Sequence, residues 1–147
     1  MSGLLIIMAK QPVVGAVKTR LCPPLTPEDA MLLYDAFLDD TIEMVAEACR
    51  IAGDVTPALA YAPSEAHDHF RAMLPGNFVL LSQIGGDLGE RLCNLPGQAQ
   101  RLGYGSVAMI SSDSPTLRPA MAADCFASCA SRKLTLCLVP ARMAATT

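Results

Sequence analysis

Three cations stand close together near the start of the chain, in the stretch "MAKQPVVGAVKTRLCPPL" (residues 8–25). They are Lys10, Lys18 and Arg20, from a total of only eleven Lys and Arg residues in 147. Such side chains donate charge-assisted hydrogen bonds to a diphosphate, and Gly15 lets backbone amides approach the same ligand. The stretch lacks the GxxxxGK[ST] spacing of a Walker A loop. The alternative interpretation is a solvated basic loop without a ligand.

A second candidate for chemistry is the carboxylate in the stretch "SSDSPTL" (residues 111–117). Asp113 follows an apolar run, in a tight turn where a carboxylate can ligate a divalent cation that bridges phosphates. Mg²⁺ and Mn²⁺ fit this role because both are hard ions that prefer oxygen ligands. The alternative is an Asx-turn, in which Asp113 only satisfies backbone amides before Pro115. The metal interpretation gains weight when it is combined with the basic loop.

A third candidate segment is "QIGGDLGERL" (residues 83–92), whose three glycines allow a ligand to approach the backbone closely. Asp87 is placed to cap the helix that follows, which is its simplest explanation. Glu90 and Arg91 are explained equally well as a pair on the surface. The residue types alone assign no direct role to this segment.

The composition limits the class of protein. Apolar residues make up 52% of the chain and charged residues 17%, which is typical of one globular domain. A net charge of −3 and an aromatic content of 5% without Trp argue against a nucleic-acid partner. No apolar run approaches the roughly 20 residues of a membrane span, and no signal peptide is recognisable. The six cysteines form no CxxC pair, so we expect reduced thiols in a cytoplasmic protein.

The elements that must position these residues alternate along the chain. Continuous apolar runs predict strands at 3–9, 56–62, 77–83 and 106–112. Helical periodicity and capping residues predict helices at 27–52 (Thr26 as N-cap, Gly53 at the end), at 64–74 (capped by Ser64), at 87–95 (broken or kinked by Pro96) and from Pro119 onward. We interpret the apolar stripe of the first helix, which includes Tyr34 and Phe37, as core without a functional role. This alternation predicts an α/β domain with a mainly parallel sheet flanked by helices, and ligands at the carboxyl ends of its strands.

Four motifs occur in a characteristic order: "AKQPVVGAVKTRL", "AFLDDT", "GGDLGERL" and "SSDSPTLRP". Together they resemble the bacterial family of GT-A-type transferases often labelled arsenosugar-biosynthesis-like or radical-SAM-associated glycosyltransferases. The resemblance runs from about Leu4 to about Phe126, and it implies the Rossmann-like fold of the nucleotide-diphospho-sugar transferases. The first loop also resembles that of 2-phospho-lactate guanylyltransferases. The alternative activity is therefore nucleotidyl transfer to a small phosphorylated compound.

The resemblance implies roles for the candidate residues. It places the diphosphate of a nucleotide-sugar, or of a nucleoside triphosphate, against Lys10, Lys18 and Arg20. It makes Asp113 the ligand of Mg²⁺ or Mn²⁺, and it lets the segment from Asp87 to Arg91 line the pocket. Asp113, Lys18 and Arg20 would then be catalytic, because a cation and basic side chains stabilise the charge that grows on the leaving group.

The last residues, 132–147, depart from the family pattern. The implied family pattern continues with a "DGGYY"-type segment, which the codons of this stretch permit in a shifted reading frame. We therefore expect an out-of-frame tail on a single domain that is incomplete at its C-terminus, with impaired activity. The bared sheet edge would allow a dimer, and a non-catalytic nucleotide-binding remnant becomes a third interpretation. The coding DNA tests this hypothesis.

Overall fold

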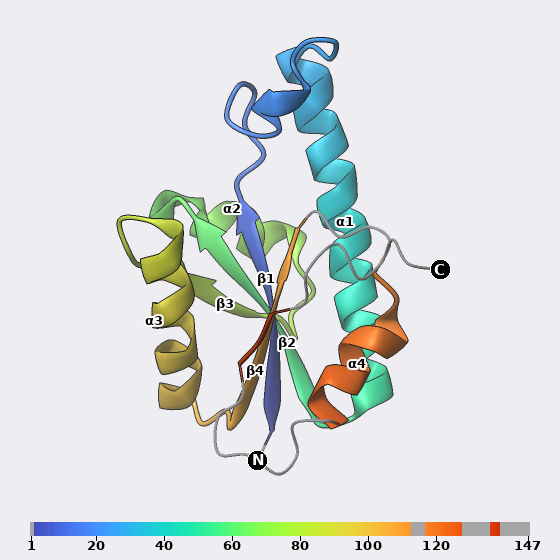
Figure 1. Ribbon diagram of the computed structural model, residues 1–147, viewed down its shortest axis with the longest axis vertical. Coiled ribbons are helices and arrows are strands. Elements are labelled where there is room, and N and C mark those ends of the chain that lie inside the picture. The colour runs from blue at the N-terminus through green and yellow to red at the C-terminus, as the bar shows by residue number, and fades with distance from the viewer. Residues whose placement is uncertain (1, 113–116, 128–135, 139–147) are drawn as a thin grey trace.

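A parallel sheet forms the centre of the computed structural model, which describes residues 2–112, 117–127 and 136–138 (Figure 1). Its strands lie in the order β3-β2-β1-β4-β5, and all four pairings are parallel. The strands are β1 Gly3–Lys10, β2 Val55–Ala62, β3 Val79–Ser82, β4 Ser106–Ser111 and β5 Leu136–Leu138. The helices are α1 Pro27–Ala52, α2 His67–Met73, α3 Leu88–Arg101 and α4 Pro119–Ala127, with short 3-10 turns at Thr19–Leu21 and Ser64–Ala66. The predicted α/β class with a mainly parallel sheet is confirmed.

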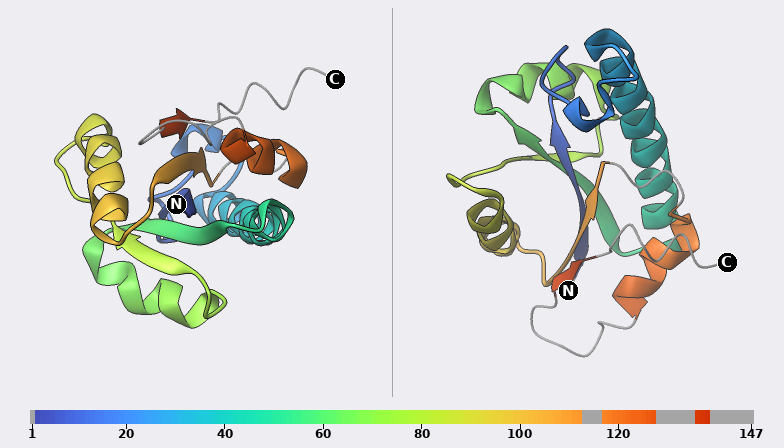
Figure 2. Two further views of the ribbon diagram at one scale, coloured as in Figure 1. Left: turned by 90° about the horizontal axis from the view of Figure 1, so that it is seen from below. Right: turned by 45° about the horizontal axis from the view of Figure 1, so that its top comes forward.

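Helices cover both faces of the sheet, which explains why its strands are continuous apolar runs. Along β1, Leu5 and Ile7 pack in a cluster with residues of α1, α2 and α4. Leu4 and Ile6 point the other way, into a second cluster with residues of α3. Figures 1 and 2 show α3 on one side of the sheet and α1 with α4 on the other.

The first helix begins and ends where its capping residues predict. The side chain of Thr26 accepts a hydrogen bond from the amide of Asp29 at 3.1 Å, and Pro27 occupies the first helical position. Gly53 follows the helix with φ of 81°, a conformation that favours glycine. The predicted apolar stripe is buried along most of its length, from Ala30 to Cys49.

Two local predictions are wrong. Ser64 caps no helix, because its side chain makes no capping hydrogen bond and it lies in a 3-10 turn before α2. Pro96 does not break α3, which continues to Arg101, and a kink there stays a prediction. Leu95 and Ala99 are fully buried against the sheet on either side of Pro96, and this packing holds the helix together across the missing amide.

The C-terminal prediction falls largely outside the described residues. Of the segment 132–147, the structure describes only β5, which pairs with β4 over Leu136–Leu138. This strand was not expected from the sequence, and the reading-frame hypothesis stays a prediction. Among the residues that the structure describes, no helix has both the length and the apolar character needed to cross a bilayer.

The strand order creates a topological switch point at the centre of the sheet. The chain passes from β1 outward to β2 and β3, and then returns to place β4 on the other side of β1. The register shows that β1 pairs with β2 as far as Lys10, but with β4 only as far as Met8. The carboxyl ends of β1 and β4 therefore separate, which is where open α/β sheets bind ligands.

Candidate functional site

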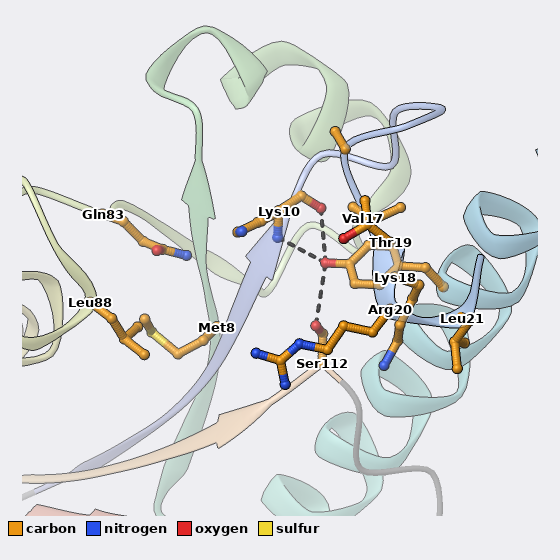
Figure 3. A pocket seen from close by; sticks show the side chains of 12 residues that line it. Met8, Lys10, Val17, Lys18, Thr19, Arg20, Leu21, Gln83, Leu88 and Ser112 are labelled. Atoms are coloured by element: carbon orange, nitrogen blue, oxygen red, sulfur yellow. Dashed lines mark hydrogen bonds between the residues drawn. The ribbon is translucent and has the colours of Figure 1, made fainter. Parts of the chain in front are cut away.

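A cavity of about 540 Å³ opens at the carboxyl ends of β1 and β4 (Figure 3). This volume lies within the usual range for small-molecule sites, about 300–1,000 Å³. The lining residues come from β1, the loop between β1 and α1, the start of α1, the segment after β3, and the end of β4: Met8, Lys10, Ala16, Val17, Lys18, Thr19, Arg20, Leu21, Tyr34, Gln83, Leu88 and Ser112. The site predicted from the strand order and the cavity found in the structure coincide.

The three predicted cations all line this cavity. Lys10 ends β1, whereas Lys18 and Arg20 belong to the loop that returns toward α1. In Figure 3 the guanidinium of Arg20 extends into the open space between Met8 and Ser112. The salt bridges found among the described residues involve neither Lys10 nor Arg20. Lys10 and Arg20 thus place positive charge on the cavity wall without a salt bridge to any carboxylate in the described part of the chain.

Lys18 has an unusual backbone conformation. Its φ of 54° and ψ of 34° place it in the left-handed region, just before the 3-10 turn Thr19–Leu21. For a residue other than glycine this conformation costs on the order of 1–3 kcal/mol and persists only where the surroundings impose it. The neighbouring Val17 is buried, and the Lys18 ammonium lies 5.7 Å from the centre of the Phe37 ring. Phe37 therefore supports one of the candidate ligand-binding cations.

Gln83 and Leu88 form a part of the cavity wall away from Lys18 and Arg20. The Gln83 side-chain amide donates to the carbonyl oxygens of Ala9, at 3.0 Å, and Ala60, at 2.8 Å. Because carbonyl oxygens only accept hydrogen bonds, these contacts fix which end of the amide faces the sheet. Leu88 begins α3 and is 63% exposed at the cavity rim. The cavity thus combines a cationic side with a less polar one.

Three other candidate residues lie near the cavity but outside its lining. Gly15 is exposed in a turn with φ of 80°, where it reverses the loop. The Asp87 carboxylate accepts from the amide of Glu90 at 2.8 Å and so caps α3. Arg91 donates from Nε to the carbonyl oxygen of Gly85 at 3.1 Å. The structure shows these residues shaping their own loops, and a direct part in ligand binding stays a prediction for all three.

The predicted metal ligand, Asp113, lies outside the described residues. Within the residues that are described, no group of three or more His, Cys, Asp or Glu side chains is arranged to hold a metal ion. The donor set for Mg²⁺ or Mn²⁺ is therefore untested by the structure. Ser112, which immediately precedes Asp113, is buried at the cavity floor and fixes where that segment begins.

Sequence reasoning missed a hydrogen-bonded group that α1 contributes to the site. The Tyr34 hydroxyl contacts the backbone of Lys10 and the hydroxyl of Ser112. Seven residues further along, the buried Thr41 donates to the carbonyl oxygens of Phe37, at 2.7 Å, and Ser112, at 3.2 Å. The available signal was a polar hydroxyl within an apolar stripe, because a buried Tyr or Thr hydroxyl needs a partner.

Within the motif "AFLDDT" (residues 36–41), Thr41 is linked to the site by its hydrogen bond to the carbonyl oxygen of Ser112. The motif's two acidic residues, Asp39 and Asp40, are exposed on α1 and do not line the cavity. Partial burial, together with the neighbouring carboxylates of Asp35 and Asp40, raises the pKa of Asp39. This acidic surface is separate from the cationic wall.

Comparison with known families gives a match over residues 44–142, about two thirds of the chain. The matching family is described as "Uncharacterized protein conserved in bacteria (DUF2064)". The chain belongs to the DUF2064 family. The match begins within α1, so the three cavity cations of this DUF2064 protein precede the matched segment.

A solved structure extends the comparison to most of the DUF2064 chain. It is a crystal structure of a "putative nucleotide-diphospho-sugar transferase" from Desulfovibrio desulfuricans G20, with 27% sequence identity and a TM-score of 0.78. The match covers 89% of this chain but 56% of the solved one, so the chain spans little more than half of that protein's length. No curated protein matches the chain. The fold is that of the nucleotide-diphospho-sugar transferases, as the motifs implied.

Proposed function

We propose that this DUF2064 protein is a glycosyltransferase that binds a nucleotide-diphospho-sugar donor in the cavity between β1 and β4. The observation that carries the proposal is the convergence of Lys10, Lys18 and Arg20 on one cavity at the switch point of the sheet. The likeness to the solved transferase-like structure supports the same class of ligand.

The electrostatics of the cavity favour an anionic ligand over a neutral one. Lys10 and Arg20 line it without a salt-bridge partner among the described residues, although the chain as a whole carries a net charge of −3. Positive charge concentrated in a concave site attracts anions more strongly than the same charge on a convex surface. When a glycosyl group leaves its donor, negative charge grows on the nucleoside diphosphate, and preorganised cations stabilise it.

A divalent cation, Mg²⁺ or Mn²⁺, is part of the proposal. Asp113 would hold it at the end of β4, where it would neutralise charge on the departing diphosphate. The chain's own residues perform the remaining work: Arg20 and the two lysines bind the phosphates, and the walls around Gln83 and Leu88 orient the rest of the donor.

Nucleotidyl transfer is the second candidate, because the cations that bind a leaving diphosphate can also bind a leaving pyrophosphate. The two activities differ in the ligand that binds first. We expect calorimetry with UDP-, GDP- and ADP-glucose, compared with ATP and GTP, each with Mg²⁺ or Mn²⁺, to show preference for a nucleotide-sugar. Preference for a nucleoside triphosphate would establish the second candidate.

Turnover separates either enzyme from the non-catalytic alternative. Donor hydrolysis, followed by chromatography of the released nucleotide, requires no knowledge of the acceptor. Release of nucleoside diphosphate supports glycosyl transfer, whereas binding without any release indicates a nucleotide-binding remnant. If no nucleotide or nucleotide-sugar binds at millimolar concentration, the proposed function is wrong.

A further inference from the structure

We infer that Tyr34 is a positioning residue of this cavity, whose hydroxyl holds the carboxyl end of β1 where β4 no longer supports it. This inference rests on the proposed function, because positioning matters only if the cavity binds an anionic ligand. Tyr34 comes from α1, and neither the motifs nor the comparisons assign it a role.

The geometry begins with the register of the sheet. β4 supports β1 as far as Met8, whose carbonyl oxygen accepts from the amide of Ser112 at 3.3 Å. In a strand, the backbone amide and carbonyl groups of successive residues point to alternate edges. The amide and carbonyl of Lys10, two residues after Met8, therefore point to the same edge of β1 as those of Met8, the edge that faces β4. The β4 ladder has ended there. The Lys10 amide instead donates to the Tyr34 hydroxyl at 2.8 Å, and the Lys10 carbonyl oxygen accepts from it at 3.0 Å.

The other side of β1 keeps its strand partner over the same length. Gln11 donates from its amide to the carbonyl oxygen of Ala62 at 2.9 Å, on the β2 side. At the end of β1, one edge is therefore paired with a strand and the other with a single hydroxyl group. Tyr34 takes the place of the missing β4 residue, so that β1 stays extended while the cavity opens beside it.

The hydrogen bonds of the Tyr34 hydroxyl also define what it does. Its proton is directed to the carbonyl oxygen of Lys10, and the oxygen accepts from the Lys10 amide and, at 3.3 Å, from the Ser112 hydroxyl. These three contacts tie the hydroxyl to the backbone of β1 and to the side chain of Ser112. The role inferred for Tyr34 is therefore one that acts through the residues that it holds.

Both sides of the candidate site depend on this contact. Lys10 presents its ammonium from the residue that Tyr34 clamps, and the loop that carries Lys18 and Arg20 starts immediately after it. Ser112, which follows β4 and also lines the cavity, is held by the same hydroxyl. Removal of the hydroxyl leaves the amide and carbonyl of Lys10 without a partner on that side, and the end of β1 can then rotate.

The test is a double-mutant cycle that uses inorganic pyrophosphate as the probe. Tyr34→Phe removes only the hydroxyl, and Lys10→Met removes the charge but keeps most of the side-chain length. We expect Tyr34→Phe to weaken pyrophosphate binding by about three- to tenfold, the scale of one lost hydrogen bond. In the Lys10→Met background the same change should have a clearly smaller effect, because the two groups act together. A purely structural loss would be equal in both backgrounds.

Tyr104→Phe is the matched control. Tyr104 packs against the core cluster on the α3 side, just before β4 and at the opposite end of the strands. We expect this variant to bind pyrophosphate as the wild type does. Hydrogen exchange gives a second measurement, since the Lys10 amide should exchange faster in Tyr34→Phe while amides in the middle of β1 keep their protection.

The outcomes separate this inference from the function on which it rests. If the wild type binds pyrophosphate and Tyr34→Phe binds it equally well, the positioning role is wrong and the cationic site stands. An equal loss in both backgrounds, with unchanged Lys10 exchange, would also overturn it. If the wild type binds neither pyrophosphate nor nucleotides, the proposed function fails, and the positioning role fails with it.

Discussion

Removal of the Arg20 guanidinium is the most direct test of the cationic cavity. Arg20 lines the cavity and extends into it, and no salt bridge to another described residue holds it (Figure 3). A hydrogen bond to a charged group contributes about 1.5–3 kcal/mol. Because Arg20 is exposed to solvent, we take the lower end of this range. Arg20→Gln should therefore weaken the binding of a nucleoside diphosphate about tenfold.

A second substitution of Arg20 separates the effect of side-chain geometry from the effect of charge. Arg20→Lys keeps the charge but loses the planar, two-pronged donor, so we expect a loss of roughly threefold, between wild type and Arg20→Gln. Isothermal titration calorimetry with UDP and GDP at constant ionic strength measures all three proteins. Arg101→Gln is the matched control, since Arg101 is an exposed arginine at the far end of α3. Equal losses in Arg20→Gln and Arg101→Gln would refute a specific site and indicate only a general effect of net charge.

Three further variants or treatments test the supporting structure. Phe37→Leu should lower the free energy of unfolding by about 1 kcal/mol in urea denaturation, because the Lys18 ammonium loses its aromatic contact, whereas Phe37→Tyr should have little effect. Burial raises the pKa of Cys49 to about 12, so about one Cys49 thiol in ten thousand is ionised at pH 8. After treatment with iodoacetamide, mass spectrometry should therefore find the label on the exposed Cys93 and none on Cys49 until the chain is unfolded. Thr26→Ala should cost about 1 kcal/mol in the same denaturation assay, because α1 loses its N-cap, and an unchanged midpoint would contradict that role.

Much of the fold could be predicted because its signals are local. Thr26 and Pro27 mark the start of α1, and Gly53 marks its end, through contacts within one or two turns of the same helix. The continuity of α3 across Pro96 could not be read in this way. That continuity depends on Leu95 and Ala99 packing against strands that are distant in the sequence, and local propensity carries no record of such packing.

The candidate site, like the fold, could be predicted only in part from the sequence. Lys10, Lys18 and Arg20 could be predicted, because three cations near the end of a buried strand must lie at the carboxyl edge of the sheet. For the wall formed by Gln83 and Leu88, the sequence predicted Asp87 as the helix cap, which the structure confirms, but it did not single out Leu88 as a lining residue. The structure uses Asp87 as the cap of α3 and turns Leu88 toward the cavity. The direction of each side chain follows from where the helix begins, and that boundary is set by the cap.

Helix α1 shows why an interpretation as core alone was incomplete. Tyr34, Phe37 and Thr41 lie three or four residues apart, on one face of the helix, and reach three separate parts of the site. Tyr34 holds the end of β1, Phe37 lies under Lys18, and Thr41 holds the end of β4. The same face is buried against the sheet, so large substitutions there would disturb stability and ligand binding together. Only changes that remove one polar group and keep the packing, such as Tyr34→Phe, can separate the two, because the helix organises the site through the contacts that also fold it.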